Sequence, residues 1–243
     1  FIYGDTGVGK SSITYPLAVE ILKRIHYQEG SSIDLKKEWK NMIYMRAPEQ
    51  EYWDGYENQL VTVFDDFSQQ TDSLQNPNVE LFEIIRSSNC FPYPLHMASL
   101  EQKANTNFTS KIIIVSSNLK SPQCASLNFP EALKRRFDLS IQIKRKYEGH
   151  TNRFDPTLYQ LEKFDMMTGS LLGAKSYNEF VSDCVNAYFS RKNFVSTIES
   201  YIDSIFEASE EVTQLEEQNR IPISQGGSFE VNSQQDEIIP DLE

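Results

Sequence analysis

Apolar positions along residues 1–120 alternate between short continuous runs and a spacing of three to four residues. The continuous runs are typical of buried strands, and they occupy residues 1–3, 41–46, 60–64 and 111–115. The periodic stretches predict helices over about 13–25 and 79–86. Such repetition of strand and helix predicts an α/β fold with a parallel sheet and helices on both faces.

Helical periodicity returns near the C-terminal end of the chain. We expect one helix around residues 177–190 and an amphipathic helix over 194–218. The apolar stripe of the second helix can pack on its own domain or dock into a neighbouring subunit, and the sequence leaves both open. The stripe consists of Phe194, Val195, Ile198, Tyr201, Ile202, Ile205, Phe206, Val212 and Leu215.

These patterns divide the chain into four parts. We expect a core over residues 1–147, a small C-terminal subdomain over 148–193, the amphipathic helix over 194–218 and a flexible acidic linker over 219–243. The chain starts inside an apolar run without Met, so we expect it to be a segment of a longer polypeptide. It contains no apolar run of about 18 residues, so we expect no membrane-spanning segment in it, although a missing upstream segment could anchor the protein.

Charge is distributed unevenly along the chain. The formal net charge is −12, but residues 207–243 hold ten acidic residues and one basic residue, so the remainder is nearly neutral. A nearly neutral core can still bind a polyanion through a local basic patch, and residues 134–146 are the densest candidate. The three cysteines are far apart and lack metal-ligand spacing, which argues against a disulfide framework or a zinc site.

A glycine-rich segment joins the first apolar run to the first helix. It has the spacing G-x-x-x-x-G-K-S of a phosphate-binding loop. Glycines allow backbone N–H groups to approach a polyphosphate, Lys10 supplies a positive charge to the β- and γ-phosphates, and Ser11 supplies a hydroxyl to Mg²⁺. The predicted binding residues are Gly4, Asp5, Thr6, Gly7, Val8, Gly9, Lys10, Ser11 and Ser12.

Two further polar clusters follow predicted strands. Asp65 and Asp66 end one strand, and Asn118 follows another. Because sites in parallel sheets form at the carboxyl ends of the strands, we expect these residues beside the phosphate loop. Asp65 would hold the Mg²⁺ shell, largely through water, and Asp66 would orient and deprotonate the attacking water. Asn118 would hydrogen-bond the γ-phosphate or that water.

The order of these motifs resembles a known family. The phosphate loop is followed by F-D-D-F-S-Q, then I-V-S-S-N, then K-R-R-F-D, as in the superfamily 3 helicases of positive-strand RNA viruses, specifically the picornavirus-like nonstructural ATPase. Residues 52–59 and 94–111 resemble additional segments of that family. The resemblance covers residues 1–147. Unlike enteroviral relatives, this chain has no cysteine-rich zinc site after the arginine motif, so no metal other than Mg²⁺ is expected.

The resemblance implies a P-loop ATPase of AAA+-like fold that uses ATP and Mg²⁺ and assembles as a homo-oligomeric ring, usually a hexamer. Arg135 and Arg136 would act in trans as arginine fingers. Lys103 would grip single-stranded RNA in the ring pore, with Phe91 or Tyr93 as candidates for stacking. It also implies a place in the host cytoplasm on replication membranes and, at Gln225-Gly226, a candidate cleavage site for the viral protease.

The motifs leave the activity open between two readings. One is an ATP-driven RNA helicase acting in genome replication, and the other is an RNA chaperone or membrane-associated remodelling ATPase without processive unwinding. A P-loop GTPase is disfavoured because Asn118-Leu119-Lys120 continues as Ser121 and so lacks the guanine-reading N-K-x-D motif. A DNA-virus helicase of the same superfamily is disfavoured by closer motif resemblance to the RNA-virus group.

Overall fold

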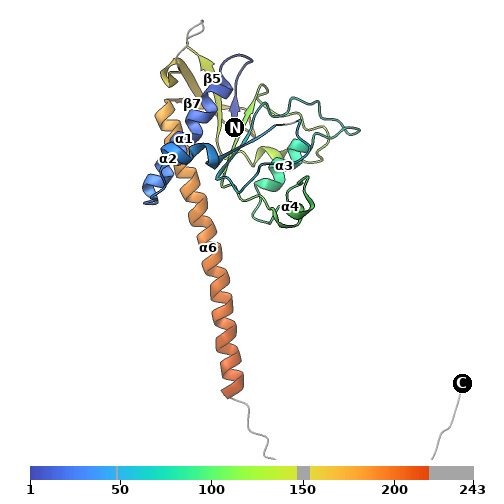
Figure 1. Cartoon of the computed structure of the whole chain (residues 1–243), viewed down its shortest axis with the longest axis vertical. Helices are drawn as coiled ribbons and strands as arrows, with labels where there is room; N and C mark the ends of the chain where they lie inside the picture. Colours follow the sequence, from blue (N-terminus) through green and yellow to red (C-terminus); the bar gives the residue numbers. More distant parts are fainter. Residues whose placement is uncertain (48, 147–153, 219–243) are drawn as a thin grey trace, which may run out of the picture. The chain divides into compact units, whose positions relative to one another are not determined.

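A seven-stranded sheet organises the computed structural model, which describes residues 1–47, 49–146 and 154–218 (Figure 1). The strand order is β2-β3-β4-β1-β5-β6-β7, and the first five strands in this order are parallel. The last two strands are antiparallel to their neighbours. The strands are β1 (Ile2–Tyr3), β2 (Ile43–Arg46), β3 (Val61–Phe64), β4 (Ile112–Ser117), β5 (Ser140–Arg145), β6 (Tyr159–Phe164) and β7 (Leu171–Lys175).

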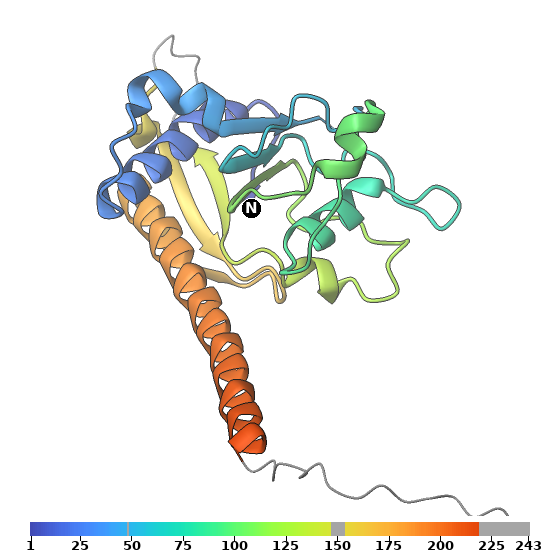
Figure 2. The same cartoon turned by 60° about the horizontal axis from the view of Figure 1, so that its bottom comes forward.

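Helices cover both faces of this sheet. Figure 2 shows α1 and the first turns of α6 on one side of the sheet and α3, α4 and α5 on the other. The predicted α/β P-loop fold is confirmed, with a mixed sheet in place of a purely parallel one. The helices are α1 (Lys10–Gln28), α2 (Leu35–Glu38), α3 (Val79–Ser87), α4 (Leu100–Asn105), α5 (Glu131–Lys134) and α6 (Tyr177–Gln218), with 3₁₀ turns η1 (Trp39–Met42) and η2 (Pro156–Leu158).

Each face of the sheet has its own apolar core. Val61 and Val63 of β3 face the core beneath α1, whereas Phe64 belongs to the core on the α3 side. All four residues of β3 are buried, which is why the strand reads as a continuous apolar run. The carboxyl end of β3 is therefore fixed from both faces, and the residues that follow it are held firmly.

An aromatic and ionic cluster supports the α3 side. The Arg46 guanidinium, from β2, forms a two-bond ion pair with the buried Glu83 carboxylate of α3 and lies 4.7 Å from the Trp53 ring centre. The Trp53 indole N–H donates to the same carboxylate at 3.0 Å. The segment around Trp53, which the sequence singles out by resemblance, thus packs into the core.

Residues beyond β5 extend the sheet. We assigned 148–193 to a small C-terminal subdomain, and within that range the described residues form β6, β7 and the start of α6. Residues 147–153 and the linker, including Gln225-Gly226, lie outside the described residues.

The chain divides into two compact units, Phe1–Asn193 and Phe194 onward. In the second unit the described side chains of the apolar stripe are exposed, at 42–69%. Packing of the stripe on its own domain and docking into a neighbouring subunit both stay predictions. Among the described residues, no helix combines the length and apolar character needed to span a bilayer.

Candidate active site

The phosphate loop runs from β1 to the first residue of α1, as the sequence predicts. Gly7 and Gly9 have φ values of +78° and +102°, which residues with a Cβ adopt only with strain. A Cβ on Gly4 would lie 2.8 Å from Val8 Cγ1 and 2.9 Å from Ile143 Cγ1 of β5. The glycine spacing therefore reflects both backbone conformation and close packing of the loop against the sheet.

Lys10 lies inside the loop. Its Nζ donates to the Gly4 carbonyl at 2.8 Å, the Asp5 carbonyl at 3.2 Å and the Asn118 Oδ1 at 2.5 Å. Burial lowers the pKa of Lys10 below its usual value of 10.5, while Asp66, Asp65 and Asp5 oppose this by favouring the charged form. The ammonium is thus surrounded by oxygen acceptors at the end of β4.

Ser11 lies against the carboxylate that follows β3. The Ser11 hydroxyl donates to Asp65 Oδ2 at 3.3 Å, and Asp65 Oδ1 accepts a 2.5 Å hydrogen bond from the Ser116 hydroxyl. A hydroxyl beside a carboxylate is a donor set that suits Mg²⁺, because this hard cation prefers oxygen ligands. The two residues predicted to hold the metal are therefore neighbours in the structure.

Asp66 begins a strained turn after β3. Asp66 and Ser68 have positive φ values of +50° and +64°, which are uncommon for non-glycine residues. Two serines of β4 stabilise the turn. The Ser116 hydroxyl accepts from the Asp66 N–H and its carbonyl accepts from the Phe67 N–H, while the Ser117 hydroxyl donates to the Phe67 carbonyl. The turn leaves the Asp66 side chain exposed.

A pocket of about 210 Å³ adjoins Asn118. It lies between the segments that follow β3 and β4, and mostly polar side chains line it. Its lining includes Ser68, Thr71, Ser117, Asn118 and Gln123.

The residues predicted as arginine fingers and as the RNA contact lie outside the phosphate loop. Arg135 is exposed just after α5, and Arg136 is half-buried with its Nε unpaired. Lys103 is exposed on α4. Within the described parts of the chain, none of these three side chains forms a hydrogen bond or ion pair with the phosphate loop.

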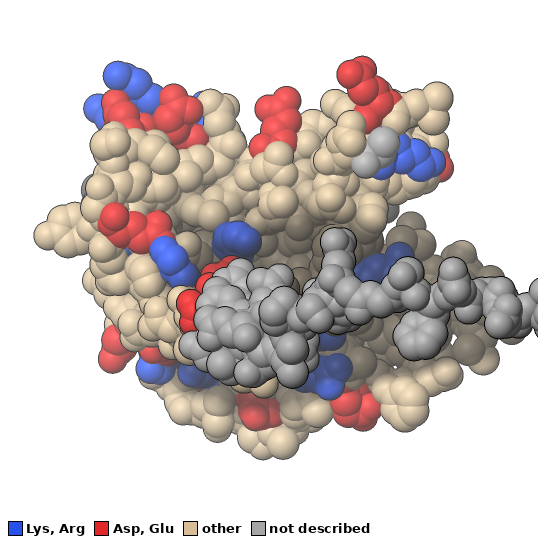
Figure 3. All heavy atoms as spheres, turned by 90° about the horizontal axis from the view of Figure 1, so that it is seen from below, with Lys and Arg blue, Asp and Glu red and all other residues tan. Residues whose placement is uncertain are grey.

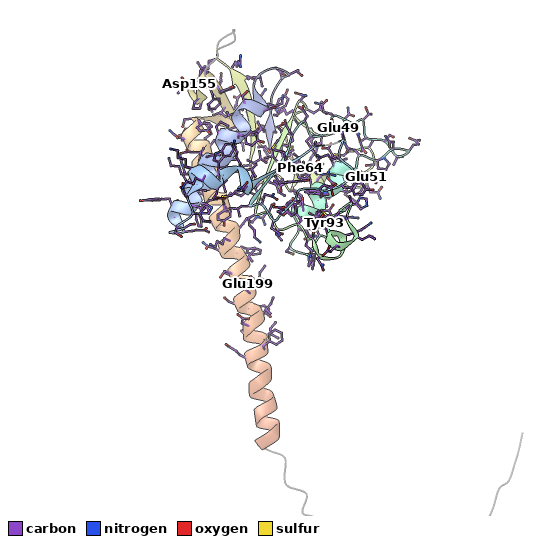
Figure 4. The ribbon with its side chains drawn as sticks, viewed as in Figure 1. Glu49, Glu51, Phe64, Tyr93, Asp155 and Glu199 are labelled. Atoms are coloured by element: carbon purple, nitrogen blue, oxygen red, sulfur yellow. The ribbon has the colours of Figure 1, made fainter. Side chains whose placement is uncertain are left out.

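The two aromatic candidates for stacking differ in exposure. Phe91 is 72% exposed, whereas Tyr93 packs partly into the core on the α3 side. Figure 4 labels Tyr93 in the part of the domain that carries α3 and α4. Burial raises the pKa of Tyr93. Phe91 is therefore the more accessible ring.

Several residues that shape the site escaped the sequence analysis. Ser116 and Ser117 brace Asp65 and the turn after it, and Arg145 of β5 donates from Nε to the Val8 carbonyl at 3.2 Å. Tyr159 of β6 places its hydroxyl beside Gly9. The serine pair is visible in the I-V-S-S-N motif, but nothing in the sequence indicates the contacts from β5 and β6.

Charged side chains are mixed over the face drawn in Figure 3. Lys and Arg alternate there with Asp and Glu, so this view shows no single basic field. Any attraction to a polyanion on this face would have to be local.

Comparison with known proteins places this geometry in context. A family model described as RNA helicase matches residues 1–119. The replicase polyprotein of acute bee paralysis virus is 45% identical over 148 residues, and that of cricket paralysis virus is 35% identical over 149. The genome polyprotein of human hepatitis A virus is 35% identical over 144 residues.

These alignments cover 59–61% of this chain but only a small part of each relative. The chain spans 8% of the length of the two insect-virus polyproteins and 6% of the hepatitis A virus polyprotein.

Proposed function

We propose that the chain hydrolyses ATP to drive work on RNA during viral replication, because the RNA helicase family model matches residues 1–119 and viral replicase polyproteins are similar to the chain. The family match and the viral relatives confirm the resemblance to picornavirus-like superfamily 3 helicases that the motif order indicates. The observation that carries the proposal is the contact of Lys10 with Asn118 and of Ser11 with Asp65, which joins three strand ends into one site.

The residues divide the chemistry of hydrolysis. Lys10 neutralises the β- and γ-phosphates, and the backbone N–H groups of the loop bind their oxygens. Asp66 orients a water molecule for attack on the γ-phosphorus and accepts its proton as the bond to the β,γ-bridging oxygen breaks. Asn118, which now binds Lys10, would turn to the γ-phosphate or that water.

Ser11 and Asp65 would hold Mg²⁺, with Asp65 acting largely through water. The ion supplies charge that stabilises the phosphates during transfer. The hydrogen bond from Ser116 to Asp65 fixes the orientation of that carboxylate.

Two features of the proposal require more than one molecule. Arg135 and Arg136 would complete the site of a neighbouring subunit in a homo-oligomeric ring, because among the described residues neither forms a hydrogen bond or ion pair with its own phosphate loop. Lys103, exposed on α4, would contact single-stranded RNA. We place this activity in the host cytoplasm on replication membranes.

Turnover of ATP by the full chain tests the proposal. Lys10→Ala should abolish hydrolysis and weaken nucleotide binding, whereas Asp66→Asn should bind ATP and fail to hydrolyse it. Lys23→Ala removes an exposed lysine of the same helix and should behave as wild type. Phosphate release at the wild-type rate by Lys10→Ala or Asp66→Asn would refute the site.

The action on RNA needs a second assay. ATP turnover is measured with and without single-stranded RNA, beside displacement of a labelled strand from a duplex. RNA-stimulated turnover with displacement supports a helicase, and turnover without displacement favours remodelling. Lys103→Ala should reduce the RNA stimulation and leave basal turnover intact.

A further inference from the structure

The strand order determines where the base of a bound nucleotide must lie. The phosphate loop follows β1, and the residues placed at the γ-phosphate follow β3 and β4, on one side of β1. β5 lies on the other side of β1. A nucleotide with its γ-phosphate toward Asn118 therefore extends its nucleoside toward the carboxyl end of β5.

Two side chains meet the phosphate loop at that end, and a third packs against one of them. Arg145, the last residue of β5, donates to the Val8 carbonyl at 3.2 Å. The Tyr159 hydroxyl lies so close to Gly9 that a Cβ there would be 2.6 Å away. Phe154 lies against Tyr159 with ring centres 6.2 Å apart and is 41% exposed. Tyr159 thus borders the loop on the side opposite Asn118, and Phe154 packs against Tyr159.

We propose that Phe154 is a stacking platform for the base of the bound nucleoside triphosphate, with Tyr159 and Arg145 as positioning residues. The inference rests on the proposed ATP site and adds the residue that recognises its base. Figure 4 labels Asp155, the residue after Phe154, at the top left of the domain, and Phe64, the last residue of β3, near the centre.

The exposure of the three residues fits these different roles. Tyr159 is 7% exposed and belongs to the core beneath α1, so it cannot offer its ring to a ligand. Phe154 is 41% exposed, and an aromatic ring stacks on any base because every base has a π-face. A purine offers more area than a pyrimidine, so the platform favours ATP over pyrimidine nucleotides.

Comparing ATP with inorganic tripolyphosphate tests the platform, because the second ligand has the phosphates without the base. The full chain and its Phe154→Ala and Phe154→Trp variants are assayed with Mg²⁺ for the KM of ATP and for inhibition by tripolyphosphate. Phe154→Ala should raise the KM about tenfold, as expected for a lost base stack, and leave the inhibition constant unchanged. Phe154→Trp should restore the wild-type KM.

A matched control separates stacking from general loss of an exposed ring. Tyr27→Ala removes a ring that is 87% exposed at the end of α1, and it should not alter either constant. An unchanged KM in Phe154→Ala, or equal weakening of ATP and tripolyphosphate, would overturn the platform while the ATP site stands. Failure of the wild type to bind ATP would overturn the proposed function and this inference with it.

Discussion

Gly9 meets two requirements at once at the entrance to α1. Its φ of +102° lies where a side chain is strained, and its Cα faces the Tyr159 hydroxyl. Gly30 has a comparable φ of +65° but open space around it. Comparing substitutions at Gly9 and Gly30 therefore separates the cost of backbone strain from the cost of a clash with Tyr159.

We expect Gly9→Ala to lose nucleotide binding and to melt at a lower temperature. Strain alone costs about 1–3 kcal/mol, and the contact with Tyr159 adds to it by displacing the loop. Gly30→Ala should lose stability through strain alone and keep the wild-type affinity for ATP. Thermal melting and nucleotide titration check both variants, and equal ATP affinity in the two would show that the crowding is harmless.

At the scale of single residues, the sequence indicates which residues form the site better than it indicates how they contact one another. The phosphate loop is identified by its glycine spacing and by Lys10 and Ser11 at its end. Binding a phosphate constrains the residue type at each of these few positions. The hydrogen bond from Lys10 to Asn118 joins residues 108 positions apart. No local periodicity encodes such a pair, which exists because β4 lies beside β1.

The turn after β3 is held by a residue of α3. The sequence predicts this helix but does not indicate its contact with the turn. Glu80, in the first turn of α3, accepts from the Ser68 N–H at 3.1 Å through Oε2 and thus holds a residue with positive φ. Burial raises the pKa of Glu80, and nearby Glu83 adds to this, while its hydrogen bonds and Arg46 oppose it. Folding therefore shifts the Glu80 equilibrium toward the protonated carboxyl, relative to the unfolded chain.

This pKa gives a pH dependence of stability with a defined sign. A carboxyl whose folded pKa is raised costs stability as pH rises from its ordinary value of 4.5 toward the raised value. Glu80→Gln keeps an acceptor for the Ser68 N–H but cannot ionise. We expect its melting temperature to exceed that of the wild type increasingly as pH rises through this interval.

Melting curves at several pH values check the effect. Glu199→Gln, on the exposed part of α6 labelled in Figure 4, should follow the wild-type pH dependence. A constant difference between Glu80→Gln and wild type across the interval would mean that Glu80 does not titrate there.

Other elements show why part of the fold escaped prediction. β5 alternates buried Ile141 and Ile143 with Gln142 and Lys144, but basic residues flank it and led to its reading as a charged patch. β7 is largely exposed, so its pattern carries little apolar signal. The two helices predicted after residue 176 are one, α6, because the polar residues between them include neither Pro nor Gly.

At the scale of the whole molecule, Arg135 and Arg136 form no hydrogen bond or ion pair with the phosphate loop among the described residues. Arg135 is exposed, and Arg136 buries an unpaired Nε among the described residues. A guanidinium is a suitable donor to a phosphoryl group, and the exposed Arg135 is accessible to one that is bound by a neighbouring subunit. The proposed ring supplies such a neighbour.

Mixing two inactive variants tests this arrangement. Arg136→Ala retains its phosphate loop, and Lys10→Ala retains its arginine, so some interfaces in a mixed ring combine an intact loop with an intact finger. With equal amounts and random assembly, turnover should recover to about a quarter of the wild-type value. As a control, Lys10→Ala mixed with Asp66→Asn should not recover, because both residues belong to the same side of every interface. Absence of recovery at every ratio, with assembly verified by light scattering, would show that Arg136 does not act in trans.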